Sequence, residues 1–398
     1  MSTTPLWHKE GTTIDEAAMA FMSKGDVFLD RHLFRYDIRA TEAHVRGLGR
    51  IDLMEDADVE RVAEALHDLD ARFQSGAFVL DDRFEDGHSA IEADLTEHLG
   101  ELGKRIHLGR SRNDQVAVAL RLFMLDHLRE VRALATDAQQ TAEYLAKTHA
   151  GTPMPGYTHL QRAMPSSVDL WMGSFAEGFR DVAHLAKLTG EWIDSSPLGT
   201  AAGYGVPLPL DREGVAQELG FDRVQENPMQ VQAARGRYEF QVLSVGWQAL
   251  QEVRRLAWDL VLFSTQEFAF VTLGPGHRTG SSIMPNKHNP DMAELLRGQH
   301  AIVGGAMAEL MQVIALPSGY QRDLQLTKNA LIRGTLATVD GLRQIPSVLA
   351  EMTLNTEAMA EAIEPAMYMT EKAVQLAAEG MSFREAYRVA AGDPDHDK

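Results

Sequence analysis

NDQVAVALRLFMLDHLREVRALATDAQQTAEYLAKTHA, residues 113–150, is the stretch that decides the fold, because it runs without a proline. Alanine and larger apolar residues recur along one side of it at helical spacing, namely Val116, Leu120, Met124, Leu128, Val131, Ala135, Ala138, Ala142 and Leu145. Proline rarely survives inside a helix, so its absence permits one continuous rod. At a rise of about 1.5 Å per residue, this rod would be on the order of 50 Å long.

Four further long runs lie between prolines, and they predict four more rods. They are bounded by Pro165 and Pro197, Pro228 and Pro275, Pro290 and Pro317, and Pro317 and Pro346. Small residues such as Ala176, Ala183 and Gly304 would let these helices approach closely. We therefore predict an all-α fold with an elongated central five-helix bundle, whose exposed apolar faces favour self-association.

The residues on either side of the rods also favour helices. Val59, Val62, Leu66, Leu69 and Phe73 recur at helical spacing behind an acidic start at residues 55–58. We predict a helical N-terminal domain over residues 1–109, the long-helix bundle over 110–352 and a short helical C-terminal domain over 353–398. Strand signals are sparse, and residues 270–273 are the best short candidate.

Composition excludes several classes of protein. The 398 residues, 44% hydrophobic and 24% charged, are typical of a soluble globular chain. No window is apolar enough to cross a bilayer, and residues 1–11 lack the apolar core of a signal peptide, so a cytoplasmic location is expected. The absence of cysteine removes disulfides, thiolate catalysis and most zinc or iron–sulfur sites. A net charge of −19 argues against nucleic-acid and membrane partners.

The usual nucleotide and metal signatures are missing, so we predict no cofactor and no metal. No glycine-rich phosphate loop, nucleophile elbow or His-Glu-x-x-His sequence is present. His88 and Glu92 have i,i+4 spacing, but two such residues alone are more often a surface pair than metal ligands. Cations lie in or beside the stretches that look functional, and they predict an anionic small-molecule substrate: Arg110, Arg112, Arg162, Arg235, Arg237, Lys287, Arg297, Arg322 and Lys328.

Three polar stretches interrupt the helical pattern at ends of the predicted rods. Residues 109–115, GRSRNDQ, would offer backbone donors and guanidinium groups to a carboxylate, or would simply form a helix N-terminus capped by Asn or Asp. Residues 154–162 contain His159, and a lone histidine is more often structural than catalytic. Residues 280–290, GSSIMPNKHNP, form either a mobile loop that presents chemistry or a plain polar connection.

Taken together, the polar stretches resemble the motifs of the argininosuccinate lyase family in the fumarase/aspartase superfamily. The matching sequences are HLGRSRNDQVA at 107–117, MPGYTHLQR at 154–162, PLG at 197–199 and GSSIMPNKHNPD at 280–291. The resemblance covers about residues 26–385. It implies reversible, cofactor-free elimination of argininosuccinate to arginine and fumarate, a step of arginine biosynthesis. It also implies a homotetramer with a 20-helix core, in which three subunits build each active site.

The resemblance also assigns roles to individual residues. It makes Ser281 the general base and His159 the general acid, with Glu294 orienting His159. Lys287 would help to activate the serine, and with Asn289 it would hold a substrate carboxylate. Closure of about residues 274–290 would exclude water. The implied substrate contacts are Ser111, Arg112, Asn113, Thr158, Tyr320, Gln325 and Lys328, with Asp30, Asp86 and Arg235 as further contacts.

Two alternatives remain open at this point. One is another fumarate-releasing lyase of the aspartase, fumarase or adenylosuccinate type, and the other is a non-catalytic, crystallin-like structural protein. The match at Tyr320, Gln325 and Lys328 favours argininosuccinate, and the intact Ser281 and His159 favour an enzyme. Departures from the family pattern lie beside the matched contacts, and the C-terminal domain is short. They are Leu108, Gln230, Gln321, Arg322, Leu326, Thr327 and Asn329.

Overall fold

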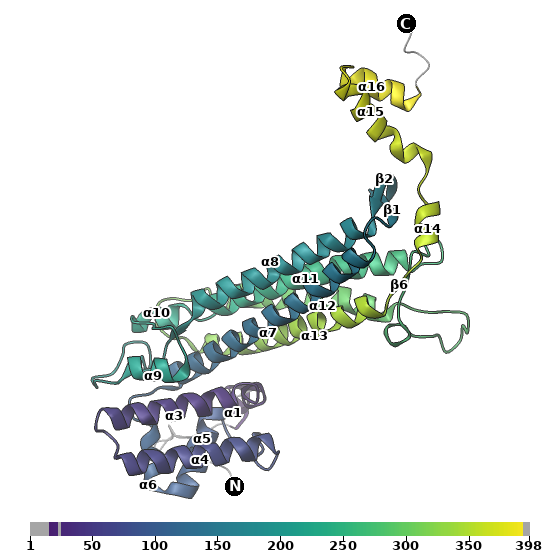
Figure 1. Cartoon of the computed structure of the whole chain (residues 1–398). Coiled ribbons are helices and arrows are strands. Elements are labelled where there is room, and N and C mark those ends of the chain that lie inside the picture. Colours follow the sequence, from purple (N-terminus) through teal and green to yellow (C-terminus); the bar gives the residue numbers. More distant parts are fainter. Residues whose placement is uncertain (1–15, 23–24, 393–398) are drawn as a thin grey trace. The chain divides into compact units, whose positions relative to one another are not determined.

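The computed structural model describes residues 16–22 and 25–392 (Figure 1). These residues are mainly helical, with three short two-stranded pairings among them, which confirms the predicted all-α class. They form two compact units. Unit 1 holds the chain up to Val131, Leu185–Trp247 and Ile302–Ala337, and unit 2 holds Arg132–His184, Gln248–Ala301 and the chain from Thr338. The three-domain division stays a prediction, and residues 1–15, 23–24 and 393–398 lie outside the described part.

All five predicted rods are confirmed, and they run side by side (Figure 1). They are α7 (Arg112–Thr148), α8 (Val168–Ile193), α11 (Arg237–Phe263), α12 (Asp291–Val313) and α13 (Thr327–Glu351). Each contributes one part to each unit. The expectation that a rod ends at Pro346 is wrong, because α13 continues through this proline to Glu351. The loss of one backbone hydrogen bond is therefore tolerated in a helix that is packed on its neighbours.

Small residues bring the long helices into close contact, as the sequence predicts. A Cβ atom added at Gly334 of α13 would lie 2.5 Å from Leu243 of α11, within unit 1. In unit 2, a Cβ atom at Gly341 would lie 2.6 Å from Leu250. Real Cβ atoms do not approach carbon so closely, so these glycines set the spacing between α11 and α13.

The N-terminal part of unit 1 is a cluster of shorter helices, as predicted. It contains α1 (Glu16–Met22), α2 (Asp26–Asp30), α3 (Phe34–Arg50), α4 (Asp56–Gln74), α5 (Gly87–Leu99), α6 (Glu101–Lys104) and the 3₁₀ turn η1 (Arg105–His107). Phe34, Leu48, Leu66, Leu69 and Ile91 form a buried core between α3, α4 and α5. This core fixes the loops around Asp30 and Asp86, which reach the site described below.

Unit 1 also contains the connection between α8 and α11 and the start of α13. Its elements are β3 (Ser195–Ser196), which pairs in parallel with β4 (Arg223–Val224), and α9 (Arg212–Leu219), α10 (Pro228–Ala233) and η3 (Arg322–Leu326). The run from Pro228 is broken between α10 and α11, where Gly236 has a φ of 79°. Glycine adopts this left-handed conformation without steric cost, so the rod α11 starts at Arg237.

Unit 2 contains a β-hairpin that the sequence did not predict. Its strands are β1 (Pro153–Thr158) and β2 (Gln161–Ser167), paired antiparallel. Prolines and a glycine replace the alternating β-branched residues that mark most strands, so no strand pattern is visible there. The predicted strand at 270–273 is confirmed over two residues as β5 (Val271–Thr272), which pairs with β6 (Thr353–Leu354) and precedes η2 (Pro275–His277).

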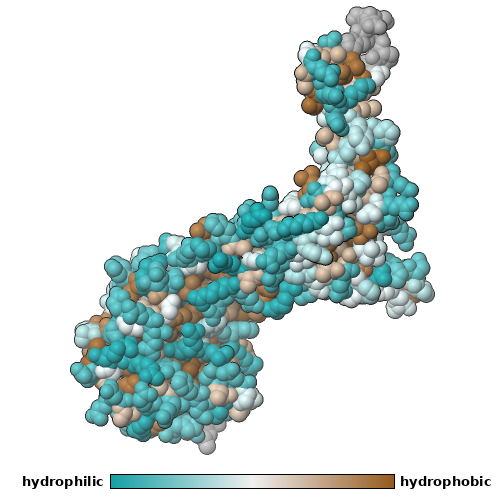
Figure 2. Space-filling model, in the orientation of Figure 1, coloured by the Kyte–Doolittle hydropathy of each residue, from teal (hydrophilic) through white to brown (hydrophobic). Residues whose placement is uncertain are grey.

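The end of the described chain is helical, as predicted. It forms α14 (Thr356–Glu361), η4 (Pro365–Tyr368), α15 (Met369–Ala378) and α16 (Phe383–Ala391). Figure 2 shows hydrophobic side chains on the surface of this segment, where Val374 and Phe383 are exposed. Across both units, none of the described helices has the length and apolar character that a bilayer crossing needs.

Candidate active site

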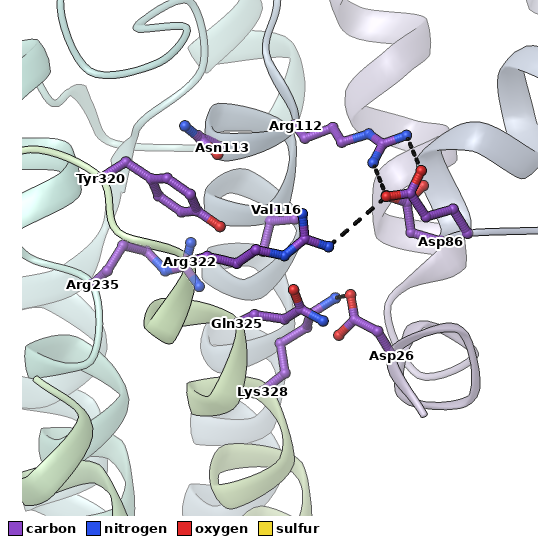
Figure 3. Close-up of a pocket in the computed structure, with 11 residues that line it drawn as sticks. Asp26, Asp86, Arg112, Asn113, Val116, Arg235, Tyr320, Arg322, Gln325 and Lys328 are labelled. Atoms are coloured by element: carbon purple, nitrogen blue, oxygen red, sulfur yellow. Dashed lines mark hydrogen bonds and ion pairs between the residues drawn. The ribbon is translucent and has the colours of Figure 1, made fainter. Parts of the chain in front are cut away.

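A polar pocket of about 140 Å³ lies in unit 1 (Figure 3). It brings together seven of the predicted substrate contacts, namely Asp86, Arg112, Asn113, Arg235, Tyr320, Gln325 and Lys328. Asp26, Glu85, Val116 and Arg322 complete its lining. The sequence gives no periodic signal for Asp26 or Glu85 as site residues, because only folding brings α2 and the loop before α5 to the ends of α7 and α13.

A capping network fixes the start of α7, and with it Arg112 and Asn113. The Asn113 backbone N–H donates to the Ser111 hydroxyl at 3.4 Å, and the Ser111 N–H donates to Asp114 at 2.8 Å. The cap is therefore Ser111, and the alternative of an Asn or Asp cap is wrong. Asp114 also accepts the backbone N–H groups of Gly199 and Ala201, at 3.0 and 2.9 Å. Burial nevertheless raises the pKa of the Asp114 carboxyl.

The guanidinium of Arg112 is held by carboxylates on the neighbouring wall (Figure 3). It lies 2.7 Å from Glu85 and 3.4 Å from Asp86, which caps α5 by accepting the Ser89 N–H at 2.8 Å. Burial disfavours the charged form of Asp86, but the nearby His88 and Arg112 together with other donors hold its pKa below the ordinary value. The guanidinium is thus oriented before any ligand binds.

Lys328 is a buried ammonium group, with only 1% of its surface exposed. Its Nζ lies 2.7 Å from Asp30 and 2.8 Å from Asp26. Burial opposes its charge, but the two carboxylates hold the pKa of Lys328 above the ordinary value. Asp30 also accepts the Gly87 N–H at 2.8 Å, which ties Lys328 to the start of α5. Asp30 acts here through Lys328, since it does not line the pocket itself.

The remaining wall comes from α10–α11 and from the segment before α13. Arg235 pairs with Glu239 at 3.3 Å and donates to the carbonyl of Leu324 at the same distance, so it holds η3 in place. The Gln325 amide donates to the Met22 carbonyl at 3.0 Å. Figure 3 shows the Tyr320 hydroxyl directed toward the centre of the pocket. Four cationic and three carboxylate side chains therefore surround one space, which suits a ligand that carries both carboxylate and cationic groups.

Unit 2 holds the predicted residues of the hairpin, of loop 280–288 and of the start of α12, and this loop is closed at its base. Thr279 and Asn289 form a bridge, in which the Thr279 N–H donates at 3.1 Å and the Asn289 N–H at 2.7 Å to each other's carbonyls. The Thr279 hydroxyl also donates to Asp291 at the start of α12. Between these anchors the side chains are largely exposed, Ile283 by 82%. The bridge makes this segment a protruding loop.

Ser281 accepts two backbone hydrogen bonds within this loop. Its Oγ accepts the backbone N–H groups of Ile283 at 3.3 Å and of Met284 at 3.0 Å. Such an arrangement is common in serine turns. It also places two donors on the oxygen where negative charge would collect if the hydroxyl lost its proton. Lys287 is exposed on the same loop, and its backbone N–H donates to Met284 at 3.1 Å.

His159 lies at the tip of the β1–β2 hairpin. It and Leu160 have φ values of 55° and 57°, as the two central residues of a type I′ turn require. Both side chains are exposed, and Thr158 precedes them at the end of β1. Among the described residues no hydrogen bond or ion pair joins His159 to Glu294, which lies in the first turn of α12. The predicted pairing of these two residues stays a prediction.

Comparison with known proteins finds relatives over most of the chain. A family model described as "Lyase" matches residues 12–305. The argininosuccinate lyase of Xylella fastidiosa (strain 9a5c) is 47% identical over 390 residues, covering 98% of this chain and 88% of that protein. That of Sorangium cellulosum (strain So ce56) is 48% identical over 388 residues, covering 98% and 90%.

Solved structures share the fold. EDDS lyase in complex with formate superimposes with a TM-score of 0.79 at 25% identity, covering 96% of this chain and 76% of that one. A class II fumarase from Schistosoma mansoni gives a TM-score of 0.77 at 17% identity, covering 98% and 93%. The latter similarity concerns the fold alone.

Proposed function

The chain belongs to the argininosuccinate lyase family, and we propose how its residues perform the family's reaction. This reaction eliminates fumarate from argininosuccinate and leaves L-arginine. Ser281, as an alkoxide, removes a proton from the carbon next to a substrate carboxylate. The electron pair moves into that carboxylate, and the resulting aci-carboxylate expels the guanidine nitrogen. His159 gives a proton to this nitrogen as the C–N bond breaks, which releases fumarate and arginine; Ser281 has then gained one proton and His159 has lost one, so the net charge is unchanged.

The observation that carries the proposal is the pair of backbone N–H groups on Ser281 Oγ, at 3.0 and 3.3 Å. A serine hydroxyl is a very weak acid, so a serine base needs donors that stabilise the oxyanion. Lys287 on the same loop would add a positive charge when the loop closes, and with Asn289 it would hold the carboxylate where charge develops.

The unit 1 pocket would bind the remainder of the substrate. Arg112 and Asn113 suit a carboxylate, since both lie at the positive N-terminal end of α7. Tyr320, Gln325 and Lys328 supply further polar groups on the opposite wall. The formate bound by the structurally similar EDDS lyase supports carboxylate binding in this fold.

We further propose that the protein is a homotetramer with a 20-helix core, located in the cytoplasm and acting in arginine biosynthesis. In such an assembly, one active site would combine the loop and the pocket of some subunits with three residues of other subunits, namely Thr158, His159 and Glu294. This arrangement is supported by the family membership and by apolar side chains exposed along the long helices, such as Leu170, Trp258 and Leu295.

A substrate panel tests the reaction. Purified protein receives argininosuccinate, arginine with fumarate, malate, aspartate or adenylosuccinate, and fumarate is followed by its ultraviolet absorbance. We expect turnover only with argininosuccinate and, in reverse, with arginine plus fumarate. Activity confined to another member of the panel would overturn the substrate assignment.

Ser281→Ala tests the base. Removal of the hydroxyl should lower kcat by about 10²-fold or more, the usual contribution of a general base, without altering the oligomer measured by light scattering. Near-normal fumarate release by this variant would exclude Ser281 as the base.

The variant His159→Asn tests the general acid. It should reduce kcat more than it changes KM.

A further inference from the structure

Three polar side chains of unit 2 meet just before residues 280–288, the loop that carries Ser281 (the Ser281 loop). His277 Nε2 shares a hydrogen bond with the Ser347 hydroxyl at 3.1 Å, and His277 Nδ1 lies 3.3 Å from the Glu351 carboxylate. Ser347 also approaches Glu351 at 3.5 Å, one turn along α13. His277 is only 7% exposed, although it directly precedes an exposed loop. The cluster therefore joins the chain entering the loop to the last turns of α13.

The chain before His277 is anchored at several points. β5 pairs with β6, and the Asn355 N–H donates to the Phe270 carbonyl at 2.9 Å. Gly274 packs so closely on Glu351 that an added Cβ atom would lie 2.7 Å from its side chain. After His277 the next fixed point is the Thr279–Asn289 bridge, and residues 280–288 protrude beyond it. His277 is thus the last buried residue before the loop.

The cluster has the composition of a nucleophilic triad, but its geometry does not support nucleophilic catalysis. Ser347 lies inside α13, where the nearby backbone N–H groups serve helical hydrogen bonds and form no oxyanion hole. His277 Nδ1 has no hydrogen-bond partner among the described residues, so the Glu351 carboxylate lies beside the ring without a hydrogen bond to it. An anchoring role accounts better for a buried ring between an exposed hydroxyl and an exposed carboxylate.

We propose that His277, Ser347 and Glu351 form a hinge clamp, which fixes the point from which the Ser281 loop closes. The proposal rests on the assignment of Ser281 to catalysis, and it makes His277 a positioning residue. A fixed hinge narrows the set of conformations that the loop samples, so less entropy is lost when Ser281 is placed against the substrate. The mobile segment then begins after His277, whereas the sequence suggested about residue 274.

Limited trypsin digestion tests the clamp without reference to activity, because Arg278 follows His277 directly and Lys287 lies within the loop. Ser347→Ala removes one partner from an exposed helical position, and His277→Phe keeps a ring but removes both polar contacts. In each variant of the full-length oligomer we expect cleavage after Arg278 to be about fivefold faster, the factor given by loss of one ordinary hydrogen bond. Ser347→Thr, which keeps the hydroxyl, should restore the wild-type rate, and Gln344→Ala on the same helix is the matched control.

Steady-state kinetics connects the clamp to the reaction. Ser347→Ala and His277→Phe should lower kcat for argininosuccinate by about fivefold, with a smaller change in KM and no change in melting temperature. Ser347→Thr should restore kcat. A merely structural role would instead lower the melting temperature and the amount of folded oligomer while leaving kcat per folded site unchanged.

The possible outcomes separate the clamp from the catalytic assignment. Unchanged cleavage after Arg278 in both variants would show that the contacts do not fix the hinge and would overturn the inference. Faster cleavage with unchanged kcat would equally overturn it, because the hinge would then have no role in turnover. If Ser281→Ala kept full activity while cleavage still accelerated in Ser347→Ala, the catalytic assignment would fail and the physical clamp would stand.

Discussion

At the scale of single residues, the pocket in unit 1 depends on charges that are buried in opposite pairs. Lys328 lies between Asp26 and Asp30, and Asp30 also receives the Gly87 N–H. A buried ion pair contributes little net stability, but the removal of one partner leaves an uncompensated charge in a poorly solvated place. The network therefore fixes the geometry of the pocket more than it stabilises the fold.

Lys328→Met should lower the free energy of unfolding by about 3–5 kcal/mol, because it leaves the buried Asp30 and the half-buried Asp26 carboxylates without their cation. Urea unfolding followed by circular dichroism measures the loss. Adding Asp30→Asn to Lys328→Met should recover part of it, since one of the stranded charges is removed. Lys287→Met is the matched control, because Lys287 is exposed and should change stability by less than about 0.5 kcal/mol. Equal losses for the two lysine variants would contradict this account.

His127 of α7 gives the fold a predictable dependence on pH. Burial lowers the pKa of its imidazole to about 3. Below an unfolded-state pKa of about 6.5, the unfolded chain therefore takes up a proton that the folded chain does not. Stability should fall as the pH drops from about 6.5 toward 3, by about 2 kcal/mol at pH 5 for this residue.

His127→Phe removes this titration and keeps a ring beside Phe123. The difference in unfolding free energy between pH 7 and pH 5 should therefore be about 2 kcal/mol smaller in the variant than in the wild type. Urea unfolding at both pH values measures it. Parallel pH dependences would show that His127 becomes protonated in the folded protein.

At the scale of secondary-structure elements, the β1–β2 hairpin presents His159 through a turn that its sequence does not favour. Type I′ turns prefer Asn-Gly, because both central residues need a positive φ. Here the central pair is His159 and Leu160, at 55° and 57°. Leu160 is 71% exposed, so packing on its side chain does not compensate for the strained backbone within this chain.

Replacing Leu160 by glycine should leave the melting temperature unchanged or raise it, because glycine adopts a positive φ freely. Leu160→Val should lower the unfolding free energy by about 1 kcal/mol, since a β-branched residue fits this conformation poorly. Differential scanning calorimetry of both variants gives the comparison. A loss of stability in the glycine variant would mean that the leucine side chain is buried in the assembled protein.

The contrast between this hairpin and the rods shows what the sequence could predict. The five rods, α7, α8, α11, α12 and α13, follow from a periodic apolar pattern and from proline placement, which are local properties. The hairpin has no such pattern, and Pro346 does not end α13, because packing on neighbouring helices outweighs the local preference. Arg112 and Lys328 were found through motifs. Their partners Glu85 and Asp26 were missed, because only tertiary folding brings them together.

At the scale of the whole molecule, the predicted site residues divide between two units. Arg112, Asn113, Tyr320, Gln325 and Lys328 lie in unit 1, and the residues proposed to move protons lie in unit 2. Large apolar side chains are exposed along the long helices, including Leu188, Met311 and Leu336. Both features agree with the proposal that copies of the chain pack through these helices and share their active sites.

Mixed oligomers test this sharing. The variant Ser281→Ala changes a residue of unit 2, and the variant Arg112→Gln changes a residue of unit 1. Each variant alone should be nearly inactive. Coexpressed, they should recover activity well above either parent, because some sites would then combine an intact loop with an intact pocket. The matched control pairs Ser281→Ala with Lys287→Met, which alter the same loop and should not complement. Lack of recovery in the first pair, with mixed oligomers verified by mass spectrometry, would show that each site is built by one chain.

The bridge between Thr279 and Asn289 also bears on how this fold could acquire other chemistry. Because the bridge fixes the two ends of residues 280–288, changes in the length and composition of that segment should not disturb the helices beyond the bridge. The entropic cost of a longer loop rises only slowly, by about 0.6 kcal/mol for each doubling of its length. We therefore expect that the reactive group of residues 280–288 can be replaced while the helical scaffold is retained.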